Sequence, residues 1–228
     1  MAMQSTLKNM AVVLGSITLV ASAAVGGIYL LTQEPIEETQ KTKINDAIAE
    51  VVGGAGAFDN TPAAEAVKIP VSSQSDPTQR SDKADTLTIY PAKRGGAVVG
   101  YAVETFSKNG FGGEMTLMVG FLPDGTIKDI SVISHNETPG LGDKIQRDKS
   151  NFSVQFQGKN PASFRLQVKK DGGDVDAITA STISSRAFTD AVARAYEGLQ
   201  SVLKADPTPA DAASGATATH THSQKGEE

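Results

Sequence analysis

A run of hydroxyl side chains precedes a predicted helix in the stretch DAITASTISS at residues 176–185. One Ser or Thr at a helix start accepts a hydrogen bond from an N–H group without a helical partner, which stabilises the helix by about 1 kcal/mol. A cap needs only one hydroxyl. Because a helix amino terminus also presents a positive dipole end, the surplus favours a bound anion such as phosphate. A capped helix and an anion site both remain open for Thr179, Ser181, Thr182, Ser184 and Ser185.

A second candidate site is the loop SHNETPGLGDK at residues 134–144. Its His135 could contact a ligand, act as a general base or be structural, and the sequence assembles no nucleophile and carboxylate around it for a hydrolase. Gly140 and Gly142 allow conformations that other residues avoid, so the loop can bring N–H groups close to a flat or anionic ligand, or form a plain turn. The cluster NGFGG at 109–113 fits a hairpin as well as a phosphate cradle. No spacing of His, Asp and Glu predicts a metal site.

The composition limits the classes of protein to which the chain can belong. It has 228 residues, a net charge of -5 and no cysteine, which suits one globular domain with attached segments. The mild acidity excludes a nucleic-acid-binding role, since no basic stripe exists to neutralise phosphates. Without cysteine the chain cannot form disulfides, thiolate nucleophiles or iron-sulfur sites, so any redox chemistry requires an organic cofactor.

The amino-terminal segment predicts a membrane anchor. Residues 9–33 carry no formal charge and are mostly apolar, and about 20 such residues cross a bilayer core as a helix. Lys8 precedes the segment and Glu34 follows it, so residues 1–8 are expected in the cytoplasm and the rest of the chain on the outer side of the membrane. A cleaved signal peptide is the alternative, since ASA at 21–23 resembles a cleavage site. The apolar run continues past that point, which favours a single-pass anchor.

The remaining sequence predicts an α+β fold. Four strand-like runs rich in β-branched residues follow one another with short turns between them, which indicates an antiparallel β-meander. The later run FRLQVKK at 164–170 is a candidate fifth strand. A helix is expected over 183–203, where alanines spaced by four would let it lie close to the sheet. The strand-like runs are TLTIYPA at 86–92, AVVGYAVETF at 97–106, EMTLMVGFL at 114–122 and TIKDISVIS at 126–134.

The segments around this domain have distinct compositions. An amphipathic helix is expected over 34–52, because its apolar residues fall near one helical face. Residues 53–85, rich in Gly, Pro and Ser, are expected to be a linker or irregular segment. The folded domain is expected over 86–204, and residues 205–228 are expected to be a disordered tail.

Four motifs, taken in order, resemble the FMN-binding domain of the G subunit of Rnf-type electron transport complexes. They are GYAVET at 100–105, GFGGEMTLMVGFLPDGTIKDISVISHNETPGLGDKI at 110–145, FSVQFQGK at 152–159 and DAITASTISS at 176–185. The resemblance covers roughly residues 87–204 plus the anchor, and its most specific part is HNETPGLG followed downstream by an acidic residue and the hydroxyl-rich element. The C subunit of sodium-translocating NADH:quinone oxidoreductase shares this domain and is the alternative. The modest length and the lack of a large insertion favour the Rnf family.

The resemblance implies covalently bound FMN, joined by a phosphoester to the last threonine of the element, here Thr182. A separate flavin transferase makes the bond from FAD with magnesium, so Thr182 is an acceptor and not a catalyst. The family pattern Ser or Thr, Gly, Ala, Thr is replaced here by Thr179, Ala180, Ser181 and Thr182. The tail sequence DAASGAT at 211–217 matches that pattern more closely, so Thr217 is a possible decoy or second acceptor.

The resemblance also implies partners and neighbours of the flavin. The expected function is that of an electron carrier, with no turnover alone, in a membrane complex that couples ferredoxin oxidation and NAD reduction to ion export. Its partners would be the other membrane subunits, the lipid bilayer and, during maturation, the flavin transferase. The location that the resemblance implies is the bacterial inner membrane, with the carboxyl-terminal domain on the periplasmic side. An anchored binding or assembly module without redox function is the alternative from another class. The residues expected around the cofactor are His135, Glu137, Thr138, Gly140, Leu141, Gly142, Gly112 and Gly113, with Ser181, Ser184 and Ser185 near the phosphate.

Overall fold

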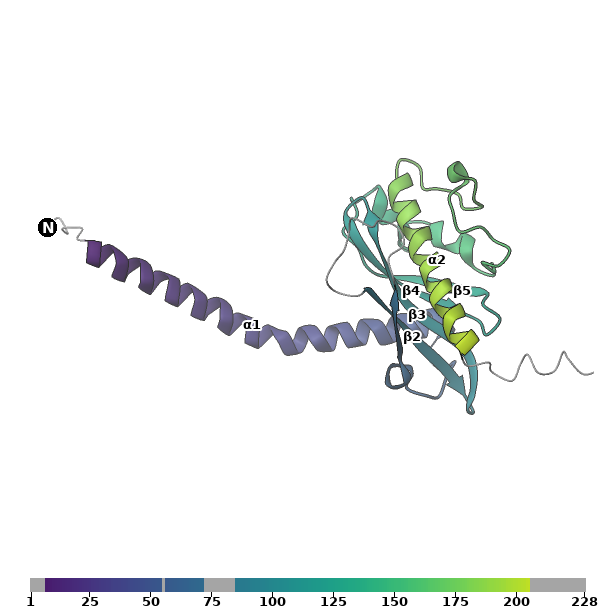
Figure 1. The fold of residues 1–228 in the computed structure, drawn as a ribbon, viewed down its shortest axis with the longest axis horizontal. Coiled ribbons are helices and arrows are strands. Elements are labelled where there is room, and N and C mark those ends of the chain that lie inside the picture. Colours follow the sequence, from purple (N-terminus) through teal and green to yellow (C-terminus); the bar gives the residue numbers. More distant parts are fainter. Residues whose placement is uncertain (1–6, 55, 72–84, 206–228) are drawn as a thin grey trace, which may run out of the picture. The chain divides into compact units, whose positions relative to one another are not determined.

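The computed structural model describes residues 7–54, 56–71 and 85–205, which divide into a unit up to Asp46 and a second unit from Ala47 (Figure 1). The first helix, α1, runs from Leu7 to Val52 without a break, whereas the sequence predicted an anchor over 9–33 and a separate helix over 34–52. Within α1, Asn9–Tyr29 has a mean hydropathy of 2.1 and is long and apolar enough to cross a membrane. The two segments that differ in composition therefore share one helical backbone.

The second unit is built on a five-stranded antiparallel sheet with the strand order β1-β2-β3-β4-β5. The predicted meander is confirmed, because its strands pair consecutively across the turns that the sequence indicated. Burial alternates over residues 103–107 of β3, whereas residues 100–103 of β3 and 117–121 of β4 are buried without a break, so both of their faces are covered. The strands are β1 Val67–Val71, β2 Asp85–Arg94, β3 Ala97–Gly110, β4 Gly113–Phe121 and β5 Ile127–Ser134.

Two expectations about the chain around this meander need correction. Residues 53–85 were expected to be irregular, yet they contain the short helix η1 Pro62–Glu65 and the edge strand β1, which the pairing with β2 stabilises. Residues 164–170 were a candidate strand but add none to the sheet. Instead Val168 makes an isolated bridge with Val175, and η4 Lys169–Asp171 follows.

The carboxyl-terminal helix α2, Thr182–Ala205, packs along one face of the sheet, with β3 as its main neighbour (Figure 1). The predicted alanine stripe is confirmed, since Ala187, Ala191 and Ala195 are fully buried. Their small side chains let the helix come so close that Thr105 of β3 donates a hydrogen bond to the Ala191 carbonyl at 2.8 Å. Three short helices complete this layer: η2 Gly142–Ile145, η3 Phe152–Phe156 and η4.

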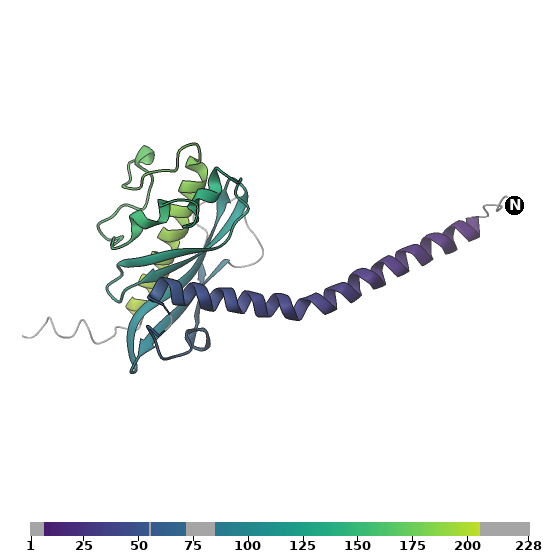
Figure 2. The same ribbon diagram turned by 180° about the vertical axis from the view of Figure 1, so that it is seen from behind.

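The opposite face of the sheet is covered by residues 47–52, the end of α1 (Figure 2). Ala47, Ile48, Val51 and Val52 are buried there. The Lys128 ammonium of β5 donates a hydrogen bond to the Val52 carbonyl, one of the acceptors left open at a helix end. The sheet is therefore covered on both faces, as expected for a meander covered by helices.

Candidate functional site

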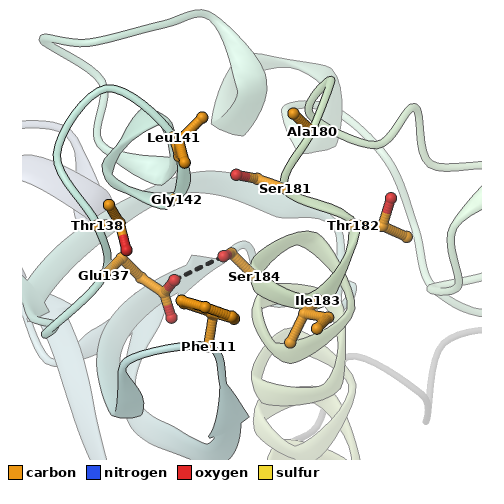
Figure 3. Close-up of a pocket in the computed structure, with 10 residues that line it drawn as sticks. All are labelled: Phe111, Glu137, Thr138, Leu141, Gly142, Ala180, Ser181, Thr182, Ile183 and Ser184. Carbon is orange, nitrogen blue, oxygen red and sulfur yellow. Dashed lines mark hydrogen bonds between the residues drawn. The ribbon is translucent and has the colours of Figure 1, made fainter.

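A pocket of about 330 Å³ opens where three segments of the second unit meet (Figure 3). They are the turn between β3 and β4, the loop between β5 and η2, and the chain that enters α2. Loop residues held on a sheet and a long helix are a common setting for ligand binding. The lining residues are Phe111, Glu137, Thr138, Leu141, Gly142, Ala180, Ser181, Thr182, Ile183 and Ser184.

The two stretches that the sequence marked as candidate sites meet in this pocket, although Gly142 and Thr179 are 37 positions apart in the sequence. From the 134–144 loop and the 176–185 element come Glu137, Thr138, Leu141, Gly142, Ser181, Thr182 and Ser184. The other predicted site residues do not line it; these are His135, Gly140, Gly112, Gly113, Thr179 and Ser185.

Several of these other residues shape the loops around the pocket. The Ser185 hydroxyl accepts a hydrogen bond from the Ile178 N–H at 2.9 Å and donates one to the Ser181 carbonyl at 2.9 Å. These bonds close the turn that leads into α2, so Ser185 supports the backbone of the site. His135 Nδ1 accepts a hydrogen bond from the Glu137 N–H at 3.1 Å, which holds the loop that carries Glu137.

Gly112 is required by close packing between the two loops. A Cβ at this residue would lie 1.8 Å from the Asn136 carbonyl oxygen. Its N–H donates a hydrogen bond to Glu137 Oε1 at 3.3 Å. The β3–β4 turn therefore contacts the 134–144 loop directly, and Gly112 acts on the pocket through Glu137.

Phe111, Ala180 and Ile183 line the pocket but were not predicted as site residues. Phe111 is 69% exposed at the tip of the β3–β4 turn, where its glycine neighbours fitted a hairpin as well as a phosphate cradle. An exposed aromatic side chain among glycines was the available signal. Of the large apolar side chains exposed in residues 47–54, 56–71 and 85–205, only Val67 lies outside this pocket; the others are Phe111, Leu141 and Ile183.

The start of α2 supplies unpaired hydrogen-bond donors to the pocket. The first helical backbone bond runs from the Ser185 N–H to the Ser181 carbonyl at 3.0 Å. The N–H groups of Thr182, Ile183 and Ser184 have no acceptor among the described residues. The first turn carries no acidic side chain. This end of a 24-residue helix therefore favours an anion.

The hydroxyl groups at the helix start differ in their availability. Ser184 donates a hydrogen bond to Glu137 Oε2 at 2.6 Å, and Ser185 is used in the turn. The hydroxyls of Ser181 and Thr182 make no hydrogen bond to the part of the chain that the structure describes. Figure 3 shows the Ser181 hydroxyl directed toward Gly142 and the Thr182 side chain on the other side of the chain. Within the described residues, the Thr182 hydroxyl is therefore not engaged by a hydrogen bond.

Gly142 and Glu137 are packed against each other at the pocket wall. The carboxylate of Glu137 is 6% exposed. A Cβ at residue 142 would lie 2.3 Å from Glu137 Oε2 and 2.6 Å from Ser184 Oγ. Glycine at 142 is therefore what allows the loop to approach the helix start.

The chain that leads into α2 is held by three ion pairs. Arg186 makes two hydrogen bonds of 2.7 Å to Asp171, and these hold the pKa of the Asp171 carboxyl below its usual range. The hydrogen bond from Arg165 likewise lowers the pKa of Asp174. Lys169 pairs with Asp176 at 2.7 Å. These contacts fix the segment before Thr179 from outside the pocket.

Comparison with known proteins agrees with the resemblance inferred from the motifs. Residues 110–197 match the family model described as FMN-binding domain. The chain is 37% identical over 185 residues to the G subunit of the ion-translocating oxidoreductase complex of Pasteurella multocida, covering 80% of this chain and 88% of that protein. It is 31% identical to the protein of the same name from Vibrio cholerae (strain M66-2), with coverage of 92% and 99%.

The chain belongs to the family of G subunits of ion-translocating oxidoreductase complexes. A third member, from Haemophilus influenzae (strain PittEE), is 33% identical over 186 residues and covers 80% of this chain. The residues that match the FMN-binding domain model include all ten that line the pocket. In this member of the family, the pocket between β3, β5 and α2 is therefore the candidate flavin site. Thr217 lies outside the described residues.

Proposed function

We propose that the protein is an electron-carrier subunit that holds FMN covalently through Thr182 in the pocket at the start of α2. The observation that carries this proposal is the position of Thr182. It is the first residue of α2, lines the pocket and has a hydroxyl without a partner among the described residues. A flavin joined there by its phosphate would carry electrons without diffusing away.

The pocket residues fit the two chemically different ends of FMN. The unpaired N–H groups of Thr182, Ile183 and Ser184 and the helix dipole suit the phosphate. The exposed apolar side chains of Phe111, Leu141 and Ile183 suit a flat aromatic ring, which would cover surface that is otherwise in contact with water. Both sets belong to one pocket, so a single ligand can satisfy them together.

Attachment at Thr182 needs no base within the pocket. A phosphoester forms between the Thr182 oxygen and the FMN phosphorus of FAD, the pyrophosphate bond breaks, and AMP leaves. The threonine proton passes to a base of the flavin transferase, which also supplies magnesium. Because the transferase would supply the base, Thr182 needs no hydrogen-bonded base in the described part of the chain.

Membership of this family supports a role within a larger membrane complex. The named relatives are subunits of an ion-translocating oxidoreductase complex, so we expect this chain to bind the other membrane subunits of such a complex. Coupling of ferredoxin oxidation and NAD reduction to ion export is the reaction we assign to that complex. The subunit alone should have no turnover. Copurification with subunits of a sodium-translocating NADH:quinone oxidoreductase would instead support the alternative family.

The apolar stretch Asn9–Tyr29 suggests a membrane-anchored protein, and we propose that the second unit lies on the outer side. Because the chain has no cysteine, single cysteines can report the orientation in whole cells. Lys149→Cys, in an exposed loop, should react with a membrane-impermeant maleimide. Ser5→Cys should react only after the cells are opened. The reverse pattern would contradict the proposed orientation.

The decisive experiment is the intact mass of the full chain produced with a flavin transferase. Wild type is expected to gain one FMN, and Thr182→Ala should lose that mass. Ser181→Ala is the matched control, because it removes the adjacent hydroxyl in the same pocket and should keep the flavin. Loss of the flavin in Thr217→Ala, with retention in Thr182→Ala, would move the attachment to the tail. Absence of added mass in wild type would favour the non-redox binding module.

A further inference from the structure

Glu137 is a buried carboxylate for which the described residues supply no positive partner. It is 6% exposed and takes part in none of the ion pairs formed within residues 7–54, 56–71 and 85–205. Burial of an unpaired charge is costly. Glutamine has nearly the same shape but only one acceptor oxygen, so it could keep one of the two hydrogen bonds that reach Oε1 and Oε2. Two neutral donors and no cation therefore hold this carboxylate at the wall of the pocket.

The position of this carboxylate is closely constrained. Both of its hydrogen bonds are donated to it, by Ser184 Oγ at 2.6 Å and by the Gly112 N–H at 3.3 Å, which is the pattern of an ionised acceptor. A Cβ at Gly110 would lie 2.5 Å from Oε1, and one at Gly142 would lie 2.3 Å from Oε2. Backbone therefore encloses the carboxylate on both sides. It cannot turn out to solvent without moving these loops.

We propose that Glu137 is a redox-tuning residue whose fixed negative charge lowers the reduction potential of a flavin bound in this pocket. The inference rests on the proposed function, since it requires the flavin to occupy the pocket. Reduction adds electrons to the cofactor, so a negative charge at the pocket wall disfavours the reduced form relative to the oxidised form. Because the carboxylate is buried, water and salt screen this effect only weakly. The hydrogen bonds of Ser184 and Gly112 keep the charge in place.

The test is an anaerobic redox titration of the full chain in detergent, after flavin loading by a co-expressed transferase. Glu137→Gln removes the charge and keeps the shape, and its midpoint potential is expected to rise above that of wild type. Glu197→Gln is the matched control for net charge. Glu197 is exposed on α2, 13 residues beyond Ser184, or about 20 Å along the helix. It should leave the potential unchanged.

Ser184→Ala separates charge from structural disturbance. It leaves the carboxylate in place but removes a donor that disperses its charge, so the potential is expected to fall below that of wild type. A rise like that of Glu137→Gln would overturn the inference, because loosening of the pocket would then explain both. If Glu137→Gln retains no flavin, Ser184→Ala decides alone, and a potential at or above wild type overturns the proposal.

Flavin content is measured first, by intact mass. It shows whether the proposed function fails or only the inference about the reduction potential. Wild type without flavin overturns the proposed function and this inference with it. If wild type and Glu137→Gln both carry flavin and have the same midpoint potential, the inference is overturned and the proposed function stands. A higher potential in Glu137→Gln, with the Glu197→Gln value equal to wild type, supports it.

Discussion

Gly120 of β4 lies directly against the carbonyl group of Val51 at the end of α1. A Cβ at residue 120 would be 2.2 Å from the Val51 oxygen and 2.7 Å from its carbonyl carbon. The obstacle is backbone, which cannot rotate away as the end of a side chain can. The lack of a side chain at residue 120 is therefore what lets residues 47–52 lie on the sheet.

Gly120→Ala is expected to destabilise the second unit by about 3 kcal/mol, the upper end of the usual cost of overpacking, because the added methyl group meets backbone. Urea unfolding of the full chain in detergent measures this loss. Gly96→Ala is the control, since its Cβ would meet open space and only its positive φ of 82° adds strain. That variant should lose about 1 kcal/mol. Equal losses would contradict the packing argument.

Ala180→Gly is expected to stabilise the protein. Ala180 has a φ of 62°, in the left-handed region, and is the one non-glycine residue with positive φ in the described ranges. Glycine relieves backbone strain of about 1–2 kcal/mol in the folded protein. The greater conformational freedom of glycine in the unfolded chain offsets part of this gain in stability. The net gain should be about 0.5–1 kcal/mol in thermal or urea unfolding.

Ala177→Gly is the matched control in the same loop, because its φ is not positive. It should destabilise by about 0.4–1 kcal/mol. Opposite signs for the two substitutions are therefore expected, and a loss of stability in both would contradict the assigned backbone conformation. The family pattern described from the sequence has glycine at the position of Ala180, so the structure gives a physical reason for that preference.

The sequence was most informative where the local pattern agrees with the final packing. Runs rich in β-branched residues with glycine-containing turns between them predicted β2 to β5, and the alanine spacing predicted α2 and its buried face. The edge strand β1 was missed, since it is five residues long, contains Pro70 and depends on β2 for its hydrogen bonds. Residues 164–170 had strand propensity but pair with none of the five strands, and Val168 instead forms an isolated bridge with Val175.

The candidate site was only partly predictable, because its assembly depends on contacts between distant residues. The motifs marked the 134–144 loop and the 176–185 element, and these do form the pocket. The sequence did not indicate that Ser185 turns toward the backbone, nor that Ser184 is engaged by Glu137. Phe111 was overlooked because its glycine neighbours indicated a turn. Such distinctions depend on side-chain direction, which residue type and spacing do not specify.

Gly142→Ala is expected to slow flavin attachment at Thr182. The new methyl group would collide with Glu137 Oε2 and Ser184 Oγ, so the loop must move and the pocket must change shape. Overpacking costs about 1–3 kcal/mol; a cost near 1.4 kcal/mol would lower the initial rate of attachment by purified transferase about tenfold. Gly140→Ala is the control, with a positive φ of 77° but open space around its Cβ. It should lose stability and keep most of the attachment rate, and a wild-type rate in Gly142→Ala would contradict the assigned pocket.

Asp171→Asn is expected to make the stability of the protein less dependent on pH under acidic conditions. The hydrogen bonds from Arg186 lower the folded-state pKa of Asp171, so the carboxylate stabilises the fold above its unfolded pKa of about 3.9. That contribution is lost as the pH falls through the lower folded pKa. Both side chains are partly exposed, so solvent screening keeps the effect small.

The measurement is the urea midpoint of wild type, Asp171→Asn, Arg186→Gln and the double variant between about pH 6 and about pH 3. The coupling between the two substitutions should be favourable at the upper end of this range and shrink toward the lower end. High salt should reduce it at every pH, since the pair lies at the surface. A coupling that stays constant with pH would show that the two residues act through packing, and that the Asp171 charge does not hold the segment before Thr182.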